Sequence, residues 1–195
     1  GERQQQAWQE LERWCMAGAG SGRVPFWRPW AAPDVPQRFA VGLLVGASGT
    51  GKSHLAEALS RQLDGDDRLQ ALPSPGARLR WRLQLKWQDC QWWRARRPED
   101  PWDCGYLVEG AAMQQRLAAF RPRRRTLMVA DALAPPVLQA SIRTLREQQR
   151  GYAHPVRLLV IDTAVPGPLT PSALGDGCGD TAVFDLGGQA RDAIA

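Results

Sequence analysis

The sequence predicts a three-layer α/β domain, in which helices flank a mostly parallel sheet of about five strands. The runs from Thr126 to Ala130 and from Arg157 to Ile161 are almost entirely apolar, and an aspartate follows each. Strands that are apolar throughout are typical of parallel sheets covered on both faces. Between these runs, Leu138, Ile142 and Leu145 recur at helical spacing. A helical crossover makes the strands on either side of it parallel.

The other expected elements follow from periodicity. The segment from Gln4 to Met16 has helical spacing, and Phe39–Val45 is a continuous apolar run that suits a buried strand. Leu79–Trp87 alternates strictly between apolar and polar residues, which predicts an edge strand with one wet face. Ala182–Leu186 is a weaker fifth strand, and Gln189–Ile194 follows as a last helical turn.

Composition favours a cytoplasmic protein with one substantial core. We expect residues 1–36 to form a helical, Trp- and Pro-rich lead-in, and residues 37–195 to form the main domain. No apolar run approaches the ~18 residues that span a bilayer, so no membrane partner is expected.

The four cysteines are far apart without a CxxC pair, which favours reduced thiols. The net charge of +5 comes mostly from arginine, because Lys52 and Lys86 are the only lysines.

The strongest motif lies between the strand Phe39–Val45 and the helix expected next. Residues 46–53, Gly-Ala-Ser-Gly-Thr-Gly-Lys-Ser, fit G-x-x-x-x-G-K-[ST]. In such a loop the backbone N–H groups converge on phosphate, Lys52 reaches the β- and γ-phosphates, and the Ser53 hydroxyl ligates Mg²⁺. The expected nucleotide-binding residues are Gly46, Ser48, Gly49, Thr50, Gly51, Lys52, Ser53 and His54.

Two aspartates complete the expected site. Asp131 follows a buried strand and is the candidate acid for Mg²⁺, together with Ser53. Asp162 follows the next buried strand and is a candidate to orient water or sense the γ-phosphate, with a turn or capping role as its alternative. Lys52, Asp131 and Asp162 are thus the candidate catalytic residues. Efficient ATPases commonly carry a second acid after the first, whereas here Ala132 occupies that place, so we expect slow or absent hydrolysis.

These motifs together resemble a P-loop NTPase of the STAND or AAA+ type, the nucleotide-binding module of bacterial signalling and defence proteins. Besides the loop, Pro101–Leu107 resembles a W-D-x-G-[FY]-L element of some STAND proteins. The segments Thr126–Asp131 and His154–Asp162 look like the Walker B and sensor strands. The resemblance implies the strand order 5-1-4-3-2. An arginine often follows the sensor strand in that family, but Thr163 stands there.

The resemblance implies a switch that binds ATP or ADP with Mg²⁺. It also implies a helical lid and sensor domains that would follow Ala195, and it leaves a homo-oligomer open. Enzyme activity, if present, is that of an ATPase of low turnover.

Two other functions stay open. The run Gly51–Ala56 is also similar to helicase loaders and replication initiators, which are AAA+ ATPases acting on nucleic acid. Tryptophans interleaved with arginines could stack on single strands, although a packed or solvated role is favoured. These residues are Trp87, Trp92, Trp93, Trp102, Arg94, Arg96 and Arg97. The same three arginines are the candidate lid of a small-molecule or nucleotide kinase.

Overall fold

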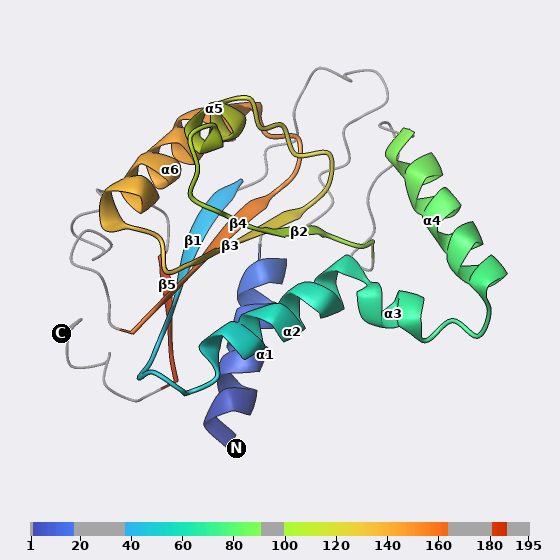
Figure 1. The fold of residues 1–195 in the computed structure, drawn as a ribbon, viewed down its shortest axis with the longest axis horizontal. Coiled ribbons are helices and arrows are strands. Elements are labelled where there is room, and N and C mark those ends of the chain that lie inside the picture. Colours follow the sequence, from blue (N-terminus) through green and yellow to red (C-terminus); the bar gives the residue numbers. More distant parts are fainter. Residues whose placement is uncertain (1, 18–37, 91–99, 164–180, 187–195) are drawn as a thin grey trace.

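The middle layer of the protein is a five-stranded sheet in which every strand pairing is parallel, in the order β2-β3-β4-β1-β5 (Figure 1). The computed structural model describes residues 2–17, 38–90, 100–163 and 181–186. The strands are β1 (Phe39–Val45), β2 (Asp103–Tyr106), β3 (Thr126–Asp131), β4 (Val156–Asp162) and β5 (Ala182–Asp185). The predicted α/β class is therefore confirmed, as are the three central strands.

Helices cover both faces of this sheet. The helices are α1 (Glu2–Met16), α2 (Lys52–Asp64), α3 (Asp66–Gln70), α4 (Pro75–Cys90), α5 (Met113–Ala118) and α6 (Pro135–Gln148). In Figure 1, α1 and α2 lie on one face, and α5 and α6 lie on the other. Leu138, Ile142 and Leu145 of α6 are buried in one core cluster, as their spacing predicts. Leu59 and Leu63 of α2 belong to the second cluster, on the opposite face.

Helix α1 is part of this second core. Leu11 and Cys15 have no exposed surface and pack with residues of α2 and the sheet. Trp14 makes a T-shaped contact with Phe184 of β5, with ring centroids 5.8 Å apart. Burial raises the pKa of the Cys15 thiol to about 12, so this cysteine is not a ready nucleophile.

A buried arginine of β4 holds the carboxyl end of α1. Arg157 is fully buried, and its Nη2 donates a hydrogen bond to the carbonyl oxygen of Ala17. Its guanidinium also lies 6.0 Å from the centre of the Trp14 ring. The last carbonyls of a helix have no partner within the helix, and a cation there also meets the negative end of the helix dipole. Burial lowers the pKa of Arg157.

The predicted edge strand Leu79–Trp87 is wrong, because this segment lies within helix α4. Ser74 precedes the helix as its N-cap: the Ser74 Oγ accepts a hydrogen bond from the Ala77 N–H at 3.2 Å. Pro75 suits the first helical position, and α4 contains no Val, Ile or Thr to favour a strand. The edge position beside β3 belongs instead to β2. The expected strand order, which included Leu79–Trp87, is therefore not confirmed in that form.

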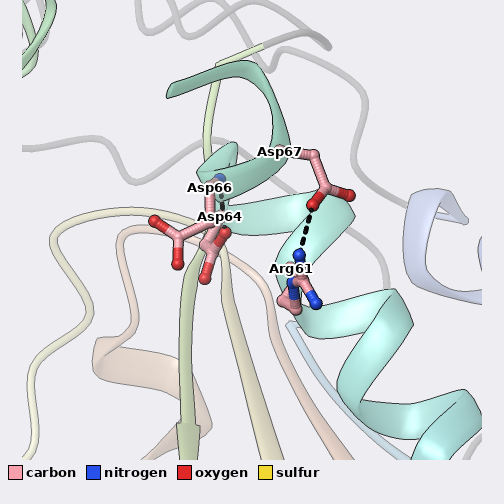
Figure 2. A network of polar contacts seen from close by, with 4 residues as sticks. All are labelled: Arg61, Asp64, Asp66 and Asp67. Atoms are coloured by element: carbon pink, nitrogen blue, oxygen red, sulfur yellow. Dashed lines mark hydrogen bonds and ion pairs between the residues drawn. The ribbon is translucent and has the colours of Figure 1, made fainter. Parts of the chain in front are cut away.

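A small network of polar contacts lies at the junction between α2 and α3 (Figure 2). Gly65, with φ of 81°, ends α2 in the left-handed conformation. The Asp64 Oδ1 accepts a hydrogen bond from the Asp66 N–H at 2.7 Å, and Arg61 donates to Asp67 at 3.1 Å. Partial burial raises the pKa of Asp64. Because the Arg61–Asp67 pair is exposed, it adds little to stability.

Some expectations lie outside the described residues. These are the lead-in after residue 17, the last helical turn at 189–194, and the boundary between residues 36 and 37, so the domain division stays a prediction. Within the described ranges, no helix combines the length and the apolar character needed to cross a membrane.

Replacing Leu11 by alanine tests whether α1 belongs to the core. We expect Leu11→Ala to lower the free energy of unfolding by about 2–5 kcal/mol, since a buried leucine is lost. Gln5→Ala, at an exposed position of the same helix, is the control and should change it by less than about 0.5 kcal/mol. Denaturant unfolding measures both. Equal midpoints for the two variants would contradict the packing of α1 described above.

Candidate functional site

The glycine loop joins β1 to α2 and leaves the sheet at its carboxyl edge. Gly49 and Gly51 have φ of 82° and 84°, in the left-handed region that side chains with a Cβ rarely adopt. Gly51 is the N-cap of α2, and its carbonyl accepts the first helical hydrogen bond, from the Leu55 N–H at 2.9 Å. The loop therefore ends on a helix N-terminus, where backbone N–H groups and the helix dipole favour an anion.

Carbonyl groups of the loop hold the lysine in place. The Lys52 Nζ donates to the carbonyl oxygens of Gly46 at 2.7 Å and Ala47 at 2.9 Å. The Ala47 carbonyl also accepts a hydrogen bond from the Thr50 Oγ1 at 2.8 Å. Lys52 is only 9% exposed. An ammonium group that makes only carbonyl contacts can exchange them for phosphate oxygens, which bind it more strongly.

Ser53 and Asp131 meet across the sheet edge. The Ser53 Oγ donates a hydrogen bond to the Asp131 Oδ2 at 2.9 Å, although 78 residues separate them in sequence. Ser53 lies in the first turn of α2 and Asp131 ends β3, so the parallel sheet brings the two residues together. A hydroxyl and a carboxylate are hard oxygen ligands of the kind that Mg²⁺ takes alongside nucleotide phosphates. The donor set therefore fits this ion.

Asp162 lies at the same edge but is engaged locally. In the register of β1 and β4 it stands opposite Val45, directly before the glycine loop. Its Oδ1 accepts hydrogen bonds from the Thr163 N–H at 2.6 Å and from the Thr163 Oγ1 at 3.3 Å. These contacts describe a turn-capping carboxylate next to the loop.

Ala132 has an unusual backbone for an alanine. Its φ is 54°, the one positive φ of a non-glycine residue in the described part of the chain. Residues held in this region cost of order 1–3 kcal/mol and often cluster at functional sites. The strained residue directly follows Asp131, at the place where an acid is commonly found in efficient ATPases.

Sequence reasoning missed Glu57, and it gave Tyr106 no role of its own within the element Pro101–Leu107. Glu57 lies one helical turn after Ser53 on α2, and Tyr106 ends β2 with half of its surface exposed. Partial burial raises the pKa of Tyr106, and the negative charges of Glu57 and Asp131 raise it further. The three side chains are therefore within electrostatic reach of one another. No motif marks a glutamate at this position, and only the fold brings it near Asp131.

Gln4 of α1 was also missed. Its Nε2 donates a hydrogen bond to the Thr50 carbonyl oxygen at 3.2 Å, across 46 residues of sequence. The first turn of α1 thus lies against the glycine loop. Nothing in the local sequence around Gln4 signals this contact, because it depends on how α1 packs.

The remaining predicted loop residues differ in exposure. Gly46 is buried at the end of β1, whereas the side chains of Ser48 and His54 are exposed. In the described residues, no group of three or more His, Cys, Asp or Glu side chains could hold a metal by itself. An ion at Ser53 and Asp131 would thus need further ligands, such as phosphate oxygens and water.

A groove of about 540 Å³ opens beside the loop that follows β2, between α5 and α6. Glu109 is its one charged lining residue, and most of the others are apolar or glycine. The full lining is Glu109, Gly110, Ala111, Met113, Gln114, Pro136, Val137 and Ala140. Gln114 is already bonded to Ser141 and Thr144 of α6. The groove therefore presents few polar groups that could orient a small ligand.

The proposed stacking surface loses one of its members. Trp102 is 2% exposed and packs in the core with α2, so it cannot stack on a base. Trp87 is 69% exposed, on α4. Trp92, Trp93 and the three arginines of that cluster lie outside the described residues.

No protein-family model matches this chain, and comparison with curated proteins and with solved structures gives no significant match.

Glycine-to-alanine substitutions test the shape of the loop. We expect Gly51→Ala to cost about 1–2 kcal/mol of stability, since alanine is strained at a φ of 84°. Its Cβ would also lie 3.3 Å from the Gln4 Nε2. The control is Gly76→Ala, in α4, where a Cβ meets nothing within 4 Å. That change should stabilise the protein by up to about 1 kcal/mol. Thermal unfolding that ranks the two variants in the opposite order would refute the loop geometry.

Proposed function

We propose that this chain is the nucleotide-binding domain of a signalling or defence switch, and that it binds ATP or ADP with Mg²⁺. The hydrogen bond between the Ser53 Oγ and the Asp131 Oδ2, 2.9 Å long, carries this proposal. This contact supports a Mg²⁺ site formed by the oxygens of Ser53 and Asp131, next to the end of the glycine loop. Lys52, held nearby by loop carbonyls, supplies the positive charge for the phosphates.

The residues divide the work as follows. Backbone N–H groups of the loop and of the first turn of α2 bind the phosphates, and Lys52 neutralises the β- and γ-phosphate charge. Ser53 and Asp131 would hold Mg²⁺, which when bound supplies charge neutralisation at the phosphate oxygens. This division follows from the positions of the groups along β1, α2 and β3.

We further propose that turnover is slow or absent. Activation of a water molecule needs a positioned base that is free to take its proton. Ala132 has no such group, and two hydrogen bonds from Thr163 to the Oδ1 of Asp162 hold that carboxylate in a local turn. Slow turnover suits a switch, in which the bound nucleotide sets a state rather than drives a cycle.

Substitution of Lys52 tests the binding site. We expect Lys52→Ala to weaken ATP binding by about 10- to 150-fold, the value of a charge-assisted contact of about 1.5–3 kcal/mol. The control is Lys86→Ala, which removes the other lysine of the chain, exposed on α4, and should bind like the wild type. Calorimetric titration measures both affinities, and phosphate release is followed in the same samples. A folded wild-type protein without nucleotide affinity would contradict the proposal.

Removal of Mg²⁺ distinguishes the proposed roles of Asp131 and Asp162. With EDTA in place of Mg²⁺, we expect wild-type ATP binding to weaken, since the phosphates lose a counter-charge. Asp131→Asn should bind ATP equally in Mg²⁺ and in EDTA, whereas Asp162→Asn should keep the difference. If Asp162→Asn alone abolished the Mg²⁺ effect, the assignment of the ion to Ser53 and Asp131 would be wrong.

A further inference from the structure

Helix α4 presents a line of large apolar side chains to solvent. Leu79, Leu83 and Trp87 are 60%, 58% and 69% exposed. They are spaced four residues apart, and at 100° per residue they fall within about 80° of the helix circumference. We call these three residues the α4 stripe. Figure 1 shows α4 set apart from the sheet, beyond α3.

The opposite side of α4 already packs within the chain. Ala77 and Trp81 lie one turn apart on that side and are partly buried, and α4 contacts α3. A helix with apolar residues on two sides is typical of a helix packed between two layers, since a surface helix has one apolar stripe and a polar back. The described residues supply the first layer only. A second layer against the α4 stripe is therefore expected.

Positive charge borders the stripe on both sides. Arg80 and Lys86 are exposed, and their positions on the helix lie just beyond Trp87 and Leu79, respectively. Over Pro75–Cys90 the sequence holds four basic residues (Arg78, Arg80, Arg82 and Lys86) against one acid, Asp89. A surface with this pattern is complementary to apolar residues bordered by Asp and Glu.

From these observations we propose that the α4 stripe docks an acidic amphipathic helix of a partner protein. Three features favour this occupant over others. A second copy of α4 would bring positive charge against positive charge. A nucleic acid stacks its bases on aromatic side chains, and two of the three residues of the stripe, Leu79 and Leu83, are aliphatic. A helix that lies on a bilayer turns its polar side to water. The side of α4 opposite the stripe carries Ala77 and Trp81 instead.

Two labelled model peptides test this surface without knowledge of the natural partner. Both are helical 21-residue peptides with leucine at the a and d positions of each heptad, and the e and g positions carry glutamate in one and lysine in the other. Fluorescence anisotropy measures binding to the full chain. We expect the glutamate peptide to bind at least tenfold more tightly than the lysine peptide.

Variants at exposed positions locate the binding site without disturbing the core. Leu79→Ser combined with Leu83→Ser should weaken the glutamate peptide at least tenfold. Arg80→Glu combined with Lys86→Glu should reverse the preference, so that the lysine peptide binds more tightly. The control is Val108→Ser, which removes another exposed apolar residue (74% exposed) outside α4, and should bind like the wild type.

Several results would overturn the proposal. One is equal binding of the two peptides, and another is the absence of binding by either peptide. Another is wild-type binding by the serine variant, which would place the site elsewhere. If the serine variant unfolded at lower denaturant than the wild type, the stripe would be covered by the chain itself. Stripe-dependent binding of oligo-dT, or of phosphatidylserine vesicles, without binding of the glutamate peptide would replace the partner helix with nucleic acid or membrane.

Discussion

Parallel pairing of β1 with β4 and of β4 with β3 is the constraint on which the site depends. In this register Asp131 stands opposite Ile161, and Asp162 stands opposite Val45. The carboxyl ends of three consecutive strands of the sheet therefore reach one edge together. A shift of one residue would turn each buried side chain to the opposite face, where it would have to repack against the other helices. The contact of Ser53 with Asp131 follows from the core rather than from local attraction.

The buried strands and the glycine loop could be predicted from sequence because their signals are local. An apolar run such as Phe39–Val45 predicts a buried strand by itself, and the glycine spacing predicts the left-handed turns of the loop. The segment Leu79–Trp87 misled because strict alternation also places Leu79, Leu83 and Trp87 on one face of a helix. The pair Ser74 and Pro75 is a helix-start signal that could have corrected this prediction.

The contacts that could not be predicted join distant segments. Glu57 and Gln4 carry no motif, and each reaches the site through packing of one element on another. Trp102 shows the opposite case. It lies near arginines in the sequence and was therefore a candidate for stacking on bases, yet it is buried against α2. Residue type and spacing in the sequence identify the residues of the glycine loop and the acids at the strand ends. Which other side chains lie near them depends on how the helices and strands pack.

The two ends of helix α1 are tied to different parts of the molecule. Near its start, Gln4 is bonded to the Thr50 carbonyl of the glycine loop; at its finish, Ala17 is bonded to Arg157 of β4. The whole helix has 15 residues and forms a rod about 22 Å long. A tilt or slide of α1 would strain one of these attachments. One of them is at Thr50, two residues before Lys52, so the position of α1 and the backbone of the glycine loop depend on each other.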